Sequence, residues 1–205
     1  MSKVKIEGNA SGTGTFTIQA PNSNSDRVLS LPDSAGEILT DAGVPASALP
    51  AGSVLQVKST TKTDTWSSSL TAGQHADVTG LNVSITPSST SSKILLMVSL
   101  TGHNGNEGGL GFYIKESGVM INQPDSTGSY GDGMLHAVDL ALTSTELQTS
   151  SNFQTLHSPA STSALTYQVR LMNYASATRT LYVNRPSGTV RYYTVSTITA
   201  MEIAG

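Results

Sequence analysis

The segment Leu165-Thr-Tyr-Gln-Val-Arg-Leu-Met-Asn-Tyr174 decides the fold class of this protein. Apolar Tyr167, Val169 and Leu171 alternate in it with polar side chains. Successive side chains of a β-strand point to opposite faces, so this pattern predicts a strand with one face in a core and one face in water.

Other segments repeat this signal or vary it. Ile94-Leu95-Leu96-Met97-Val98 is apolar at every position, as expected for a strand buried between two layers. Tyr193, Val195, Met201 and Ile203 share one parity, which suits a long last strand through the middle of a sheet. Ten strands are predicted: Ser53–Ser59, Leu81–Thr86, Lys93–Thr101, Leu110–Glu116, Gly118–Asn122, Met134–Leu142, Asn152–His157, Leu165–Tyr174, Thr178–Asn184 and Arg191–Ile203.

Glycine, asparagine and proline separate these strands at regular intervals, and no helical period extends over more than about ten residues. The predicted fold class is therefore all-β: an antiparallel, jelly-roll-like β-sandwich over residues 53–205. Residues 41–52, rich in alanine, glycine and proline, are predicted to form a neck.

Residues 1–40 are predicted to form an extended arm of very short strands separated by turns. Each strand offers only two or three apolar side chains, which is too few to offset the entropy of ordering the segment. We therefore expect the arm to order against copies of itself or against another protein, and the whole protein to be a homotrimer. The apolar side chains expected to pack in the arm are Phe16, Ile18, Val28, Leu29, Leu31, Ile38 and Leu39.

The composition argues against catalysis and cofactors. Among 205 residues there are 30 Ser and 26 Thr, only 12% charged residues and no Cys. The four His residues lie in four separate segments without metal-ligand spacing, although three symmetry-related His on a trimer axis remain an open possibility. No P-loop, dinucleotide fingerprint or nucleophile elbow occurs, so we predict a protein that is not an enzyme, with no cofactor.

Charge and hydropathy exclude further classes of protein. A net charge of −3 gives no basic field for nucleic acid. The longest apolar run, Ile94–Val98, is far shorter than the ~20 residues that cross a bilayer, so no membrane insertion is expected. The first residues lack the apolar core of a signal peptide.

Three stretches resemble appendage proteins of bacteriophages of the marine or cyanobacterial type. GTGTFTIQAPNSNSDRVLSLPDSAGEIL, residues 12–39, is similar to the stem segment of tail fibres. LPAGSVLQV, residues 49–57, and STITAMEIA, residues 196–204, resemble the first and last strands of the distal β-sandwich knob. Together these stretches cover about a quarter of the chain.

This resemblance implies a structural protein of the virion, a trimeric fibre. Its arm would anchor it to other virion proteins, and its knob would contact a host-surface glycan or protein. Only about 40 residues precede the knob, and no repeated shaft is present. Two interpretations therefore stay open: a short fibre of the tail, or alternatively a decoration or head-fibre trimer on the capsid.

Two glycine-rich loops are the candidates for receptor contact, because exposed loops on a rigid sandwich commonly carry binding function. Residues 102–109 contain an Asn-x-Asn-x-Gly run similar to a calcium loop, but they lack its leading Asp and distant Glu, so a hairpin tip is predicted. In the second loop, residues 125–133, a tyrosine could stack on a sugar ring. The candidate residues are His103, Asn104, Asn106, Glu107, Asp125, Tyr130 and Asp132. For Trp66, the only tryptophan, a packing role is preferred over a carbohydrate platform.

Overall fold

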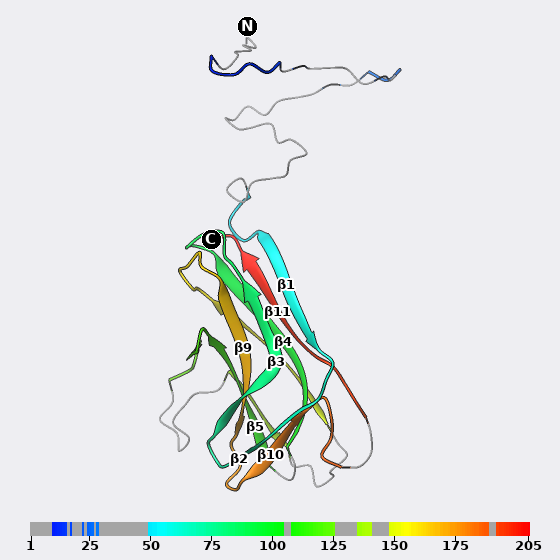
Figure 1. The fold of residues 1–205 in the computed structure, drawn as a ribbon, viewed down its shortest axis with the longest axis vertical. Coiled ribbons are helices and arrows are strands. Elements are labelled where there is room, and N and C mark those ends of the chain that lie inside the picture. The colour runs from blue at the N-terminus through cyan, green and yellow to red at the C-terminus, as the bar shows by residue number, and fades with distance from the viewer. Residues whose placement is uncertain are drawn as a thin grey trace. The chain divides into compact units, whose positions relative to one another are not determined.

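The computed structural model describes residues 10–15, 17, 22, 24–26, 28, 49–104, 108–125, 135–140, 148–188 and 192–205. The chain divides into two units, Met1–Leu39 and Thr40–Gly205. The second unit contains all the described strands (Figure 1). The neck over residues 41–52 stays a prediction.

The second unit is built from antiparallel strands, and no helix occurs among the described residues. The all-β prediction is therefore confirmed. The strands are β1 (Val54–Lys62), β2 (Trp66–Leu70), β3 (His75–Ile85), β4 (Lys93–Asn104), β5 (Gly108–Glu116), β6 (Val119–Met120), β7 (His136–Leu140), β8 (Thr149–His157), β9 (Leu165–Asn173), β10 (Arg179–Val183) and β11 (Ser196–Ile203).

The strands form two packed sheets with the connectivity of a jelly roll. In sheet A, β1, β11, β4 and β8 lie side by side in that order, and β10 and β2 continue the sheet beside the last part of β4. In sheet B the order is β3, β9, β5 and β7, with β6 beside the end of β5. Four strands of sheet A (β1, β11, β4 and β8) face four strands of sheet B (β3, β9, β5 and β7), and along the chain these eight change sheet at every step except from β5 to β7. This is the connectivity of a jelly roll, so the jelly-roll-like prediction is confirmed.

The core lies between the two sheets and follows the period-two pattern of the sequence. In β9, Tyr167, Val169 and Leu171 are fully buried, and the side chains between them are part-exposed. This agrees with the strand predicted to have one wet face. Phe112 is also fully buried, and it contacts both sheets: its ring lies 5.3 Å from that of His136 in β7 and 5.5 Å from that of Phe153 in β8.

The prediction that Ile94–Val98 is buried on both faces is wrong for the single chain. Ile94, Leu96 and Val98 face the core and are at most 3% exposed. Leu95 is only partly buried and Met97 is 36% exposed, because none of the described strands forms a second layer over the outer face of β4. The apolar character of this outer face therefore has no explanation within one copy of the fold.

Strand β2 was not predicted, because Trp66 and Leu70 are separated by three serines. Both apolar side chains pack against the edge of the core, which agrees with the packing role preferred for Trp66. The last strand, β11, does lie in the middle of its sheet, between β1 and β4, as predicted. Its core face, however, is formed by Ser196, Ile198, Ala200 and Glu202, while Met201 and Ile203 lie on the outer face.

Candidate functional site

Two of the residues proposed for receptor contact are not in a loop. His103 and Asn104 are the last residues of β4 and are 1% and 0% exposed. They pair with Tyr182 and Leu181 of β10, which extends β4 past Gly102. The prediction that these two side chains contact a receptor from a hairpin tip is therefore wrong, because strand pairing buries them.

The surroundings of His103 hold the end of β10 in place. The Nε2 atom of His103 lies 3.0 Å from the hydroxyl of Ser187, and its ring lies 6.0 Å from that of Tyr182. The guanidinium of Arg185 sits 5.2 Å from the centre of the Tyr182 ring, a cation–π distance. A histidine next to a serine hydroxyl is part of many acyl-transfer sites, but here the histidine is buried and only the serine is part-exposed.

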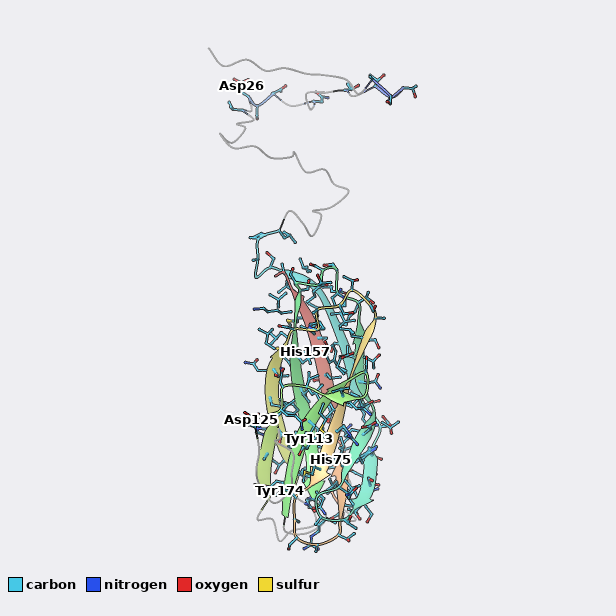
Figure 2. The ribbon with its side chains drawn as sticks, turned by 90° about the vertical axis from the view of Figure 1, so that its left-hand side faces the viewer. Asp26, His75, Tyr113, Asp125, His157 and Tyr174 are labelled. Carbon is cyan, nitrogen blue, oxygen red and sulfur yellow. The ribbon has the colours of Figure 1, made fainter. Side chains whose placement is uncertain are left out.

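Of the remaining receptor-contact candidates, one lies among the described residues. Asp125 is exposed, at the periphery of the sandwich (Figure 2). The other four, Asn106, Glu107, Tyr130 and Asp132, lie outside the described residues.

The packing predicted for the arm can be compared with the structure at one position only. Val28 is described and is 90% exposed, so it packs against none of the residues that the structure describes. The other arm candidates, Phe16, Ile18, Leu29, Leu31, Ile38 and Leu39, lie outside the described residues.

Two adjacent aromatic side chains form a surface that the sequence analysis missed. Tyr192 and Tyr193 are 63% and 65% exposed, and Val195 beside them is 55% exposed. Strand alternation would send neighbouring side chains to opposite faces, but β11 begins only at Ser196, so alternation does not apply to these two tyrosines. The signal in the sequence was the Tyr-Tyr pair itself, next to the start of a strand.

The backbone of this tyrosine segment is fixed at both ends. The Nε2 of Gln148 donates to the carbonyl of Tyr192 at 3.0 Å, and the amide of Thr194 donates to the carbonyl of Asn184 at 3.2 Å. At the other end of β11, Ala204 exchanges backbone hydrogen bonds with residues 52 and 53. The whole of β11, eight residues and about 26 Å long, therefore separates the tyrosines from the point where the chain enters the sandwich.

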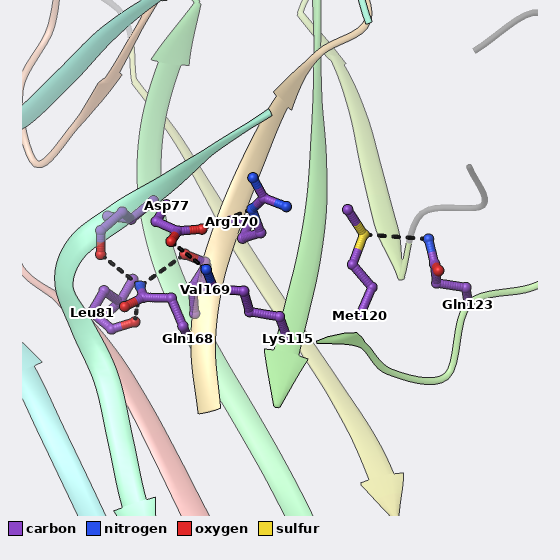
Figure 3. A network of polar contacts seen from close by, with 9 residues as sticks. Asp77, Leu81, Lys115, Met120, Gln123, Gln168, Val169 and Arg170 are labelled. Atoms are coloured by element: carbon purple, nitrogen blue, oxygen red, sulfur yellow. Dashed lines mark hydrogen bonds and ion pairs between the residues drawn. The ribbon is translucent and has the colours of Figure 1, made fainter. Parts of the chain in front are cut away.

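The outer face of sheet B carries a cluster of charges (Figure 3). Asp77 of β3 accepts from Lys115 of β5 at 2.5 Å and lies 2.7 Å from the Nε of Arg170 in β9. Gln168 donates to the carbonyls of Val78 and Leu81 on the same face. Two cations against one carboxylate leave the cluster with a net charge of +1, and its polar contacts tie three strands together.

A buried carboxylate lies at the end of the sandwich next to the neck. Glu202 is 0% exposed, and its Oε1 accepts from the amide and hydroxyl of Ser88 and the hydroxyl of Ser92 at 2.6–2.7 Å. Its Oε2 accepts from the Nε2 of Gln56 at 2.6 Å. Burial raises the pKa of Glu202, but these hydrogen bonds outweigh burial and hold its pKa below the ordinary value. The ionised carboxylate therefore joins β1, β11 and the β3–β4 connection.

A second titratable pair lies inside the sandwich. The Nδ1 of His157 is 3.0 Å from the hydroxyl of Tyr167. Burial lowers the pKa of His157, against the opposing charge of Glu116, and burial raises the pKa of Tyr167. Both side chains are therefore held in their neutral forms at neutral pH. We assign this pair a role in packing the sandwich.

Within the residues that the structure describes, no group of three or more His, Asp or Glu side chains is placed to hold a metal ion. None of the elements described is a helix long and apolar enough to cross a membrane.

Comparison with known proteins adds a fold likeness only. No protein-family model matches the chain, and no curated protein matches it. Among solved structures, the chain is similar to the infectious bursal disease virus VP2 subviral particle, with 14% identity and a TM-score of 0.36. The match covers 73% of this chain and 38% of the viral chain, so this protein spans well under half of the VP2 chain.

Proposed function

We propose that this protein is a structural protein of a bacteriophage particle: a trimeric fibre anchored by its N-terminal arm, with the jelly roll contacting the host surface. The observation that carries the proposal is the exposed pair Tyr192 and Tyr193, at the end of the jelly roll opposite its connection to the neck. A fibre needs its contact surface at the end away from its anchor.

The chemistry of this surface supports the proposed role. Tyrosine offers a flat apolar ring for stacking on a sugar and a hydroxyl for hydrogen bonding, and it loses little conformational entropy on binding. Backbone hydrogen bonds preorganise the segment, which lowers the cost of association. The resemblance of residues 12–39 to a fibre stem is the basis for the anchoring role of the arm.

The location of the protein on the particle tests the proposal directly. An antibody raised against the full chain is expected to label intact phage particles in negative-stain electron microscopy, at the tail. Label confined to the head would support the alternative, a decoration or head-fibre trimer. Absence of label from particles whose genome encodes the chain would contradict both.

The tyrosine surface gives a second prediction. The full chain, labelled with a fluorophore, is expected to bind cells of the host bacterium, and the double variant Tyr192→Ser/Tyr193→Ser is expected to bind about tenfold or more weakly. Loss of one stacking contact alone costs on the order of 1–3 kcal/mol. Flow cytometry measures the binding.

The control for this experiment is Val119→Ser, which alters another side chain with 70% exposure, on β6. It is expected to leave cell binding unchanged. If the double tyrosine variant binds as well as the unmodified chain, the contact surface lies elsewhere.

A further inference from the structure

The outer face of sheet A has an unusual composition for a surface in water. Its strands β1, β11, β4 and β8 expose one parity of side chains, opposite to the parity that forms the core. These outer residues are Val57, Ser59, Thr61, Thr197, Thr199, Met201, Ile203, Leu95, Met97, Ser99, Thr101, Ser150, Asn152, Gln154 and Leu156. None of them is charged, and Lys93 at the start of β4 is the one cation of the same parity.

Apolar side chains form a continuous row across this face. The strand register places Val57 opposite Met201, Met201 opposite Leu95, and Leu95 opposite Leu156. With strands about 4.8 Å apart, the row spans about 14 Å and crosses all four strands. Val57 and Leu156, at its two ends, are 51% and 48% exposed. Such an ordered row is not the scattered pattern of single exposed apolar residues that is common on protein surfaces.

A hollow of about 440 Å³ lies beside this row. Met97, Ser99, Gln154, Thr197 and Thr199 are among the residues that line it. A surface with both an apolar row and an adjacent hollow can bind a partner through apolar contact and through shape complementarity.

Charge distinguishes the two outer faces of the sandwich. Sheet B carries Asp77, Lys115 and Arg170 on its outer face, and these groups would have to lose water if that face were covered. Sheet A has no such groups among the outer residues named above. An uncharged face can be covered by an identical copy without desolvating or opposing any charged group.

The position of the face also favours a second copy as its occupant. The row lies at the end of sheet A where β1 begins, next to Gly52 and Ser53. Three copies packed through this face around a threefold axis along the strands would have their chain entries at the same end of the assembly. The N-terminal segments, too poor in apolar side chains to order alone, would then start side by side.

We propose that the outer face of β1, β11, β4 and β8 is the surface through which copies of this chain pack against one another. The inference rests on the trimer of the proposed function and identifies the contact that holds its jelly rolls together. It also explains why Ile94–Val98 is apolar on both faces: one face fills the core of its own sandwich, and the other is covered by a neighbouring copy.

Light scattering on the purified full chain tests the surface. The unmodified protein is expected to have a mass of three times 21.3 kDa at micromolar concentration, and Val57→Glu/Leu156→Glu is expected to have a mass of 21.3 kDa. Both replaced side chains are about half exposed, so the fold tolerates the change, which far-ultraviolet circular dichroism verifies. Val119→Glu, on β6, is the matched control and is expected to leave the mass unchanged.

A thiol probe reports on the same face, since the chain has no cysteine of its own. A cysteine introduced by Met97→Cys is expected to react with a maleimide at least tenfold more slowly in the assembled protein than in the double glutamate variant. Val119→Cys is expected to react equally fast in both.

Each other outcome overturns the inference in a recognisable way. A mass of 21.3 kDa together with a slowly reacting thiol at position 97 would mean that the chain's own arm covers the face. The same mass together with a fast-reacting thiol would mean that no copy covers the face. An oligomer that keeps its mass in the double glutamate variant would mean that copies associate elsewhere. None of these results decides whether antibody labels phage particles, so the proposed function is tested separately.

Discussion

Replacement of Phe112 by alanine is expected to lower the free energy of unfolding by about 3–5 kcal/mol. The Phe112 side chain is fully buried, and its ring packs against both His136 of sheet B and Phe153 of sheet A. Alanine would leave a cavity between the sheets that neither neighbour can fill, because His136 and Phe153 are already stacked on each other at 5.7 Å. Chemical denaturation followed by intrinsic fluorescence measures the loss.

Two further variants make this result specific. Phe112→Leu keeps most of the buried volume and is expected to lose roughly 1 kcal/mol. Val119→Ala removes an exposed side chain and is expected to change stability by less than about 0.5 kcal/mol. A loss below about 1 kcal/mol for Phe112→Ala would contradict the packing of the two sheets through this ring.

Replacement of Glu202 by alanine is expected to cost about 3–4 kcal/mol of stability. The four donor groups that bond the carboxylate, from Gln56, Ser88 and Ser92, would all lose their acceptor. Glu202→Gln keeps the volume and the carbonyl oxygen, and is expected to lose about half as much. Thermal and denaturant unfolding at neutral pH compare the three proteins.

The same carboxylate makes stability depend on pH. The folded state holds the pKa of Glu202 below its ordinary value of 4.5. The contribution of Glu202 to the free energy of unfolding is therefore complete above pH 4.5. It is lost as the pH falls through the lower pKa of the folded state. Unfolding midpoints of the unmodified chain are expected to fall below about pH 4.5, and those of Glu202→Gln to fall less steeply. Parallel pH profiles for the two proteins would show that Glu202 is not the group responsible.

Most strands of the sandwich could be predicted because they have a local signal. In β9, three buried apolar side chains alternate with polar ones, and turn residues close the strand at both ends. Strand β2 escaped prediction because its only apolar residues, Trp66 and Leu70, lie four positions apart with serines between them. Its existence depends on pairing with β10, which is more than 100 residues away.

The candidate site was predicted less well, for a related reason. The glycines around His103 suggested a loop, but pairing with β10 continues β4 through Asn104 and buries both side chains. Tyr192 and Tyr193 were expected on opposite faces of a strand, but the strand starts after them. In both places a contact between distant segments, absent from any local pattern, set the end of the strand.

Alternation of apolar and polar side chains by itself determined that this chain forms an antiparallel sandwich, because a strand shows its two faces in its own sequence. Only the tertiary structure decided which of two apolar faces becomes the core. Leu95 and Leu96 are equally apolar, yet Leu96 is buried and Leu95 is not. The difference comes from sheet B, which covers one side of β4 and leaves the other side open.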